Sequence, residues 1–333
     1  MEEPDLPRWG TGLFSILILL TITANLLVIA SFLSEPRLLK HHFNLYLLNL
    51  AVTDLLVGVI AMPHYAMYSH YGYWPFTHAH CSFWMFFDYL LTSESLWGIA
   101  AISVDRVWAV CVPFSYRNCP SYRKCLLASV LSWTIAVAVL LPGFVKTRRE
   151  HLNATTCDCD WMSEGDEETS SAVVVLVLGE WLPVIITVVC FLITTGKLMR
   201  ISVNRKKRIA ETGIVTWRRH GSCRVRDAQD RQAFVLQTLL VVAVLLTWMP
   251  WFVESARKLL LHREDGVFYI VAYCVAYGLS GLNPFLFNAA SAEMRLSLRS
   301  FLRRTLCSRG SGDGAAVHPR PSPLTSCSIN AAA

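Results

Sequence analysis

Asp88 is the residue whose type and position are most informative about the binding chemistry of this protein. It lies in the sequence FFDYLL, residues 86–91, inside a long apolar stretch. No lysine or arginine occurs between Cys81 and Arg106 that could neutralise it. A carboxylate near the centre of a bilayer costs roughly 2.5–3.5 kcal/mol, so such a residue faces a cavity or a partner. Asp88 therefore predicts a site for a cation supplied from outside the protein, such as a small amine.

Asp88 also begins a stripe of residues at helical spacing. The stripe consists of Asp88, Thr92, Ser95, Ile99, Ile102 and Arg106. At 1.5 Å per residue, its two ends are roughly 27 Å apart, which is close to the thickness of a membrane. One helix face thus joins an acid near one membrane surface to a base near the other. This layout is expected of a protein that binds a ligand at one end and responds at the other.

Composition places this stripe in a membrane protein. Of the 333 residues, 54% are hydrophobic and only 16% are charged, and a soluble domain could not bury so much apolar surface. Seven apolar runs, each able to span a hydrocarbon core of about 30 Å, lie near residues 11–33, 44–68, 79–111, 125–145, 172–199, 232–257 and 267–290. Backbone groups must be satisfied within lipid, so the predicted fold is all-α, a seven-transmembrane helix bundle. Kinks or local distortions are expected at Pro63, Pro142, Pro183, Pro250 and Pro284.

The distribution of lysine and arginine predicts the orientation. With the N-terminus outside, the inner segments hold 22 of these residues and the outer segments 7, while Arg106 is the remaining one of 30. The predicted parts are an extracellular N-terminus (1–10), the seven-helix domain (11–290), a cytoplasmic amphipathic helix on the membrane surface (291–307) and a disordered tail (308–333). The net charge of +6 indicates anionic lipid or a protein partner and not nucleic acid. No metal-ligand cluster, nucleophile–base motif or repeated half indicates an enzyme or a transporter.

Three cysteines fall in outward positions. A disulfide from Cys81 to Cys157 or to Cys159 would tie the second outer loop to the third helix, and Cys159 is preferred because it leaves a shorter path to the fifth helix. Three free thiols are the alternative. The same loop carries a glycosylation sequon at Asn153, and Cys307, after a basic amphipathic stretch, is a candidate for palmitoylation.

Short motifs occur in order along all seven runs. They are Asn25, LAVTD at 50–54, DRV at 105–107, Trp133, Pro183, TWMP at 247–250 and NPFLF at 283–287. Any one of these motifs is a weak signal, but the ordered set is specific. Across nearly its whole length, the sequence resembles the rhodopsin-like (class A) G-protein-coupled receptors.

This resemblance implies an amine-binding site in a plasma-membrane receptor. Asp88 falls where aminergic members of that family hold the ligand ammonium, and aromatic residues fall where such receptors enclose the cation. A well-placed ring contributes about 0.5–2 kcal/mol by cation–π attraction, although ordinary helix packing is the alternative explanation for aromatic residues. The residues expected to bind the ligand are Asp88, Tyr89, Thr92, Glu180, Trp248, Trp251, Phe252, Tyr273 and Tyr277.

The fifth and seventh helices narrow the choice of ligand. Tyr277 stands where opsins carry the retinal lysine, so the resemblance does not extend to opsins. Catecholamine receptors use serines where this sequence has Val175, Leu176 and Gly179, which disfavours dopamine and adrenaline.

Glu180 points to a different amine. It precedes Pro183 by three residues, whereas histamine receptors of the third and fourth subtypes carry a glutamate four residues before that proline. The offset turns the side chain by about 100° on a regular helix, so Glu180 could also face a neighbouring helix. The sequences WPF at 74–76, DYLL at 88–91 and SYR at 115–117 resemble the same branch. Histamine-like ligands are therefore the first expectation, and acetylcholine-like ligands the second, although Phe252 replaces a muscarinic asparagine.

Two further sets of residues match the family. Asp54, Ser95 and Ser280 match part of its sodium pocket, but Leu279 replaces a common asparagine, so weakened sodium binding is predicted. No cofactor and no other metal site is expected. The residues that match the family's conformational switch are Asp105, Arg106, Asp230, Asn283, Pro284 and Phe287. In particular, Arg106 is expected to pair with Asp230 in the resting state until a ligand shifts the population.

Three tyrosines that are usual in the family are absent, with Val107, Phe191 and Phe287 in their places. Phenylalanine cannot replace the hydrogen bonds of the last two phenols, which support the active state, so weak or atypical signalling is predicted. The expected partners are a small-molecule amine, a heterotrimeric G protein and membrane lipid, with arrestin and a second receptor copy as further candidates. The alternative function is a non-signalling seven-helix protein that acts as a decoy, dimer partner or scaffold.

Overall fold

The computed structural model describes residues 8–40, 43–118, 121–151, 159, 173–212, 221–261 and 266–310. Within these residues the chain forms helices and no strand. The helices are α1 (Arg8–Ser34), η1 (Pro36–Lys40), α2 (Asn44–Leu56), η2 (Val57–Ala61), α3 (Met62–Tyr71), α4 (His78–Cys111), α5 (Pro113–Asn118), α6 (Ser121–His151), η3 (Val175–Trp181), α8 (Leu182–Thr212), α9 (Gly221–Leu261), α10 (Gly266–Ala290) and α11 (Ala292–Gly310).

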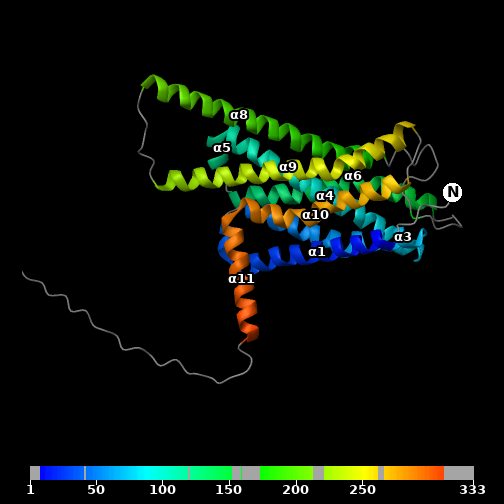
Figure 1. Cartoon of the computed structure of the whole chain (residues 1–333). Coiled ribbons are helices and arrows are strands. Elements are labelled where there is room, and N and C mark those ends of the chain that lie inside the picture. Colours follow the sequence, from blue (N-terminus) through cyan, green and yellow to red (C-terminus); the bar gives the residue numbers. More distant parts are fainter. Residues whose placement is uncertain are drawn as a thin grey trace, which may run out of the picture.

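The long helices lie side by side as a bundle, and α11 crosses one end of it (Figure 1). Six stretches of the described residues are long and apolar enough to span a membrane: 10–34, 44–71, 122–146, 175–208, 231–261 and 266–290. The seventh helix of the bundle is α4, which is more polar because Asp88, Glu94, Asp105 and Arg106 lie along it. The predicted seven-helix fold is therefore confirmed.

Helix α4 tolerates these polar residues because other helices cover it. It packs against α2, α6, α8 and α9. In the predicted stripe, the side chains of Asp88, Ser95 and Arg106 are buried, and only Thr92 is partly exposed. The helix begins at His78, and the residue before it, Thr77, is the N-cap: its hydroxyl accepts a hydrogen bond from the backbone N–H of His80 and so pairs an otherwise unpaired donor.

Two of the predicted distortions take the form of π-helical turns. The turn η2 ends two residues before Pro63, and η3 ends two residues before Pro183. Proline has no N–H for the preceding turn, so a widened turn is a common accommodation at such a position. The turn η3 contains Glu180 and therefore affects the direction in which that side chain points.

The two ends of the bundle are distinct. At one end, Cys81 forms a disulfide with Cys159, which confirms the preferred pairing; we call this the disulfide end. At the same end, α3 finishes at Tyr71 and is capped by Gly72, which has a φ of 68° that favours glycine. At the other end, the α11 end, Arg295 of α11 donates hydrogen bonds to the carbonyls of Asn288 and Ala289. These bonds satisfy the last carbonyls of α10 and fix the direction of α11.

Candidate functional site

The centre of the site is the carboxylate of Asp88. It is 1% exposed, and both of its oxygens accept hydrogen bonds from α10: Oδ1 from the Tyr277 hydroxyl at 2.6 Å and Oδ2 from the Tyr273 hydroxyl. No lysine or arginine among the described residues forms an ion pair with it. Asp88 is thus a buried acid whose described partners are neutral phenols, which leaves its charge uncompensated.

Aromatic rings surround this carboxylate. Tyr65 of α3 stacks on Tyr273, with ring centroids 4.3 Å apart and an interplanar angle of 13°. Trp251 of α9 meets the edge of Tyr273 at 5.0 Å and 87°, and Phe14 of α1 contacts Tyr277 at 5.9 Å. The rings come from α1, α3, α9 and α10, so helices far apart in sequence build the surround together.

A second acid lies on the other side of Trp251. Oε2 of Glu180 accepts a hydrogen bond of 2.6 Å from the indole Nε1 of Trp251, and Glu180 is 4% exposed. Trp251 therefore contacts Glu180 through its N–H and Tyr273 through its ring. This position settles the direction of Glu180, which points into the bundle toward α9.

The wall formed by the fifth membrane span is apolar and tightly packed. Val175, Leu176 and Gly179 are buried, and Ser93 donates a hydrogen bond of 2.8 Å to the carbonyl of Gly179. A Cβ atom placed on Gly179 would lie 2.9 Å from the Ser93 hydroxyl. A side chain at this position would therefore require the Ser93 hydroxyl to move.

The other predicted ligand-binding residues are placed less directly. The Thr92 hydroxyl donates to the Asp88 backbone carbonyl at 2.7 Å, so it serves its own helix. The ring of Phe252 packs against Trp248, with centroids 5.9 Å apart, while Tyr89 is partly buried on α4. The indole Nε1 of Trp248 is buried, and the described residues offer it no hydrogen-bond partner.

The residues predicted for the sodium pocket do come together deeper in the bundle. Asp54 is fully buried and accepts hydrogen bonds from Asn283 at 2.8 Å and from Ser95 at 3.2 Å, and the Ser280 hydroxyl also bonds to it. Leu279 is buried next to Ser280 and offers no oxygen. The amide oxygen of Asn283 has no hydrogen-bond partner among the described residues, so an oxygen ligand remains available beside Asp54.

Glu94 forms a polar network that the sequence did not explain. Its Oε1 accepts hydrogen bonds from Asn49 of α2 at 3.1 Å and from Ser132 of α6 at 2.9 Å, and its Oε2 has no partner among the described residues. The oxygen of Asn49 in turn accepts from the indole of Trp133 at 3.1 Å. Glu94 thus links three helices and faces away from the aromatic surround of Asp88.

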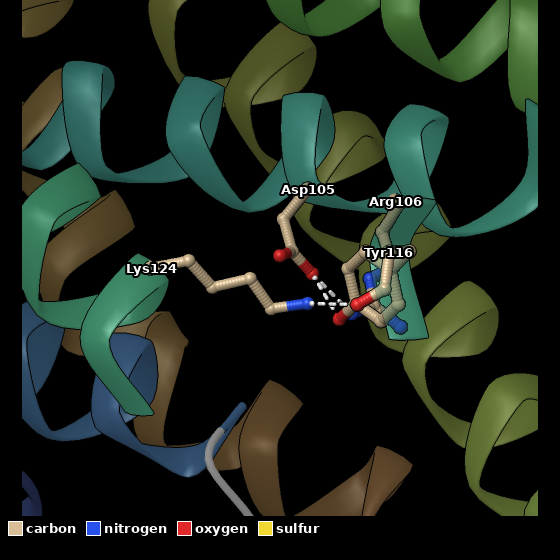
Figure 2. Close-up of polar contacts among 4 residues, drawn as sticks. All are labelled: Asp105, Arg106, Tyr116 and Lys124. Carbon is tan, nitrogen blue, oxygen red and sulfur yellow. Dashed lines mark hydrogen bonds and ion pairs between the residues drawn. The ribbon is translucent and has the colours of Figure 1, made fainter. Parts of the chain in front are cut away.

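At the α11 end, the switch arginine is held by its neighbours (Figure 2). Arg106 pairs with Asp105 and donates a hydrogen bond of 2.9 Å to the Tyr116 hydroxyl, which donates to Asp105 at 3.0 Å. Lys124 lies over the Tyr116 ring and donates to its backbone carbonyl at 3.3 Å. Burial raises the pKa of the Tyr116 phenol above its ordinary value, so the phenol keeps the proton that it donates.

The structure does not test the roles predicted for several residues. The side chains of Asp230 and Cys307 and all of Asn153 lie outside the described residues. The pairing of Arg106 with Asp230, the palmitoylation and the glycosylation therefore stay predictions. Phe287 is fully buried, and Asn283 and Pro284 are buried beside it in α10.

Residues that the sequence did not single out complete the site. Tyr65, Phe14 and Ser93 touch Tyr273, Tyr277 and Gly179, respectively, across helix boundaries. Tyr65 lies in the second apolar run with no local pattern to mark it. A search for tyrosines within one turn of the predicted disulfide end of each run would have included it.

Seven helices, one of which runs from the buried acid of Asp88 to the buried arginine of Arg106, define a seven-helix membrane receptor. A comparison with protein-family models agrees, because residues 24–287 match the model described as the 7 transmembrane receptor (rhodopsin family). The chain therefore belongs to the rhodopsin family of G-protein-coupled receptors, which are signalling proteins and not enzymes.

The individual relatives are aminergic receptors. The D(1) dopamine receptor of Carassius auratus is 30% identical over 328 residues, covering 89% of this chain and 88% of the relative. The D(1B) dopamine receptor of Xenopus laevis is 27% identical over 324 residues, covering 87% and 69%. The D(1B) dopamine receptor of Mus musculus is 28% identical over 271 residues, covering 73% and 56%. These comparisons do not support the expected closeness to histamine and muscarinic receptors.

Proposed function

We propose that this protein is a plasma-membrane receptor that binds a small biogenic amine at Asp88 and activates a heterotrimeric G protein. The observation that carries the proposal is the carboxylate of Asp88, which is buried between two phenols with no cation from the described residues beside it. A buried charge without a counter-ion is costly, and a ligand ammonium would compensate it. The surrounding rings of Tyr273, Tyr277 and Trp251 would add cation–π attraction.

The proposed orientation has the disulfide end outside and the α11 end in the cytoplasm. The excess of lysine and arginine in the loops on the α11 side supports it. In this orientation Arg106 and the basic segment 197–231 face the G protein, and α9, which carries Trp248 and Trp251, leads from the ligand site toward it. Arrestin, a second receptor copy and lipid along α11 are further proposed partners.

Two acids favour a ligand with two polar ends. An ammonium at Asp88 and an imidazole or other hydrogen-bond donor at Glu180 would use both carboxylates, which supports a histamine-like ligand. An acetylcholine-like ligand is second, because it would use the aromatic surround but not Glu180. Dopamine is the ligand in the names of the relatives, but the wall of Val175, Leu176 and Gly179 offers no hydroxyl for a catechol.

The non-signalling alternative rests on Phe191 and Phe287, which replace tyrosines. The comparisons do not favour it, because the relatives are dopamine receptors. We therefore propose that these two residues reduce the strength of signalling without abolishing it.

The test is radioligand binding of histamine, acetylcholine and dopamine to membranes that contain wild-type receptor, Asp88→Asn or Glu94→Gln. Glu94→Gln is the matched control, because Glu94 is a buried acid on the same helix that faces away from the site. Loss of one partner of a buried charge pair costs about 2–5 kcal/mol, so Asp88→Asn should weaken binding at least about 30-fold. An amine that binds wild type and Asp88→Asn equally, or no saturable amine binding to surface-expressed wild type, would refute the proposal.

A further inference from the structure

Two histidines from different helices meet at the disulfide end. Nε2 of His64 in α3 and Nε2 of His80 in α4 are 2.8 Å apart, and their ring centroids are 4.9 Å apart. We propose that this pair binds one divalent transition-metal ion that prefers imidazole nitrogen, copper(II) first and zinc second, and that the ion bridges α3 and α4.

The contacts of His64 prepare it as a metal ligand. Its Nδ1 lies 2.6 Å from the backbone carbonyl oxygen of Ile60. A carbonyl oxygen can only accept a hydrogen bond, so Nδ1 carries the proton, and in the neutral ring Nε2 presents a lone pair toward His80. Histidines that bind metals characteristically donate their other ring N–H to a carbonyl or carboxylate in this way, which fixes both tautomer and ring direction.

Coordination geometry and the affinity order of the metals bear on which ion the pair would bind. With metal–nitrogen bonds of about 2.0–2.1 Å, two neighbouring ligands of a tetrahedral zinc ion are about 3.3–3.4 Å apart. Two neighbouring ligands in a square-planar site with bonds of about 2.0 Å are about 2.8 Å apart, and this geometry is typical of copper(II). The observed 2.8 Å is the length of a hydrogen bond from His80 Nε2–H to His64 Nε2, and with ring centroids 4.9 Å apart the two nitrogens point largely at each other. Either ion therefore requires His80 to lose this proton and both rings to turn toward the metal, and copper(II) is preferred because nitrogen sites bind it more tightly than zinc.

Aromatic neighbours hold both rings in place. Phe76 stacks on His80, with centroids 4.7 Å apart and an interplanar angle of 25°, and Trp74 stacks on His64 at 6.3 Å and 20°. His64 and His80 are nevertheless both partly exposed, so an ion can reach them from the surface. The described residues contain no group of three or more possible metal-ligating side chains. The site therefore has two protein ligands, and water completes the coordination.

A bridging ion would act on the amine site. His64 is followed by Tyr65, which stacks on Tyr273 and thereby supports the hydrogen bond to Asp88. His80 lies eight residues, or about 12 Å, along α4 from Asp88. Holding α3 against α4 would favour one arrangement of these residues and shift amine affinity by about 5–150-fold, reciprocally. This consequence rests on the proposed function, whereas metal binding itself does not.

The experiment measures copper directly, without any amine. Full-length receptor purified without a polyhistidine tag is titrated with Cu²⁺ in nanodiscs and followed by electron paramagnetic resonance. We expect one tightly bound equivalent whose spectrum contains two imidazole nitrogens. His64→Gln and His80→Gln should each weaken binding at least about tenfold. His70→Gln is the matched control, because His70 is an exposed histidine on α3 and should leave binding unchanged.

Competition with zinc and with magnesium tests whether the ligands are imidazole nitrogens. Zn²⁺ should compete with Cu²⁺ only when it is in large excess, because nitrogen sites bind copper(II) more tightly, while Mg²⁺, which prefers oxygen ligands, should not compete. A wild-type spectrum with fewer than two imidazole nitrogens overturns the proposal even if the variants fail to fold, as does unchanged copper binding in folded His64→Gln and His80→Gln. If copper binds as expected but no amine binds, the proposed function fails while the metal site stands.

Discussion

The indole N–H of Trp251 donates a hydrogen bond of 2.6 Å to Glu180, while the ring of Trp251 meets Tyr273 edge-on at 5.0 Å. Because Tyr273 donates to Asp88, one tryptophan connects the two buried acids of the site. A ligand that pairs with either carboxylate must therefore adjust to, or displace, the position of this indole. The arrangement also explains how Glu180 can be buried, since its carboxylate has a hydrogen-bond donor in Trp251.

Trp251→Phe should destabilise the receptor. The substitution keeps an aromatic ring but leaves the buried carboxylate of Glu180 without its indole donor, which should cost about 1–3 kcal/mol. Thermal unfolding of the purified receptor measures the loss. Trp181→Phe is the matched control, because the buried Nε1 of Trp181 has no hydrogen-bond partner among the described residues. Equal effects of the two substitutions would show that the bond to Glu180 contributes nothing.

Tyr277→Phe should lower stability more when residue 88 is a charged aspartate than when it is neutral. Hydrogen bonds to charged groups contribute about 1.5–3 kcal/mol, and Tyr277 donates such a bond at 2.6 Å. In the Asp88→Asn background the same substitution should cost less, so a double-mutant cycle isolates the interaction. Additive effects on the unfolding temperature of the four proteins would contradict the assignment.

The spacing of residues on α4 predicted which face of this helix is buried. Helical periodicity placed Asp88, Ser95 and Arg106 on a common buried face, and the apolar runs gave the seven helices. Periodicity could not place Glu180, because a π-helical turn covers Val175–Trp181 and changes the regular 100° step on which the prediction relied. The side chain of Glu180 therefore had to be located by structure.

Contacts between segments that are distant in sequence also could not be predicted from the sequence. Tyr65 and Tyr273 are separated by the whole middle of the chain, yet their rings stack at 4.3 Å. The same holds for Glu94 with Ser132 and for His64 with His80. A single sequence carries the periodicity of each helix but not the rotation of one helix against another, which packing decides.

Glu94→Gln should be tolerated, whereas Glu94→Ala should not. A glutamine oxygen can accept the hydrogen bonds from Asn49 and Ser132, and the substitution removes a buried charge whose Oε2 has no described partner. Alanine would leave the Asn49 amide donor unpaired and create a small cavity, at a cost of about 1–3 kcal/mol for the unpaired group, whereas the Ser132 hydroxyl can still donate to the Ser129 carbonyl. Thermal unfolding of the two variants decides the matter; a glutamine variant as unstable as the alanine variant would mean that the charge itself is needed.

Leu279→Asn should increase the effect of sodium on the receptor. Asp54, Ser95 and Ser280 already meet, and an asparagine oxygen would supply the ligand that Leu279 lacks. The measurement is amine affinity as a function of NaCl, with N-methylglucamine keeping the ionic strength constant. Leu279→Ala is the control for the loss of apolar packing. Strong sodium sensitivity in wild type, or none gained by Leu279→Asn in a folded receptor, would contradict the prediction.

Restoring two tyrosines should strengthen signalling. Phe191 stacks on Phe234 across α8 and α9, with centroids 6.2 Å apart and an angle of 13°, and Phe287 is fully buried in α10. Neither ring can donate a hydrogen bond, so the active state lacks two bonds, each of which contributes about 0.5–1.5 kcal/mol. Phe191→Tyr with Phe287→Tyr should therefore raise the active population by about 5–150-fold if both bonds form, since coupling of 1–3 kcal/mol corresponds to that range.

Activation of G proteins by surface-matched receptors measures this effect, both without ligand and with the amine that binds best. Phe234→Tyr is the control, because it adds a phenol to the same stacked pair from the opposite helix. Each single tyrosine should give part of the gain. A strong wild-type response that the double substitution leaves unchanged would mean that this receptor reaches its active state through contacts other than those phenols.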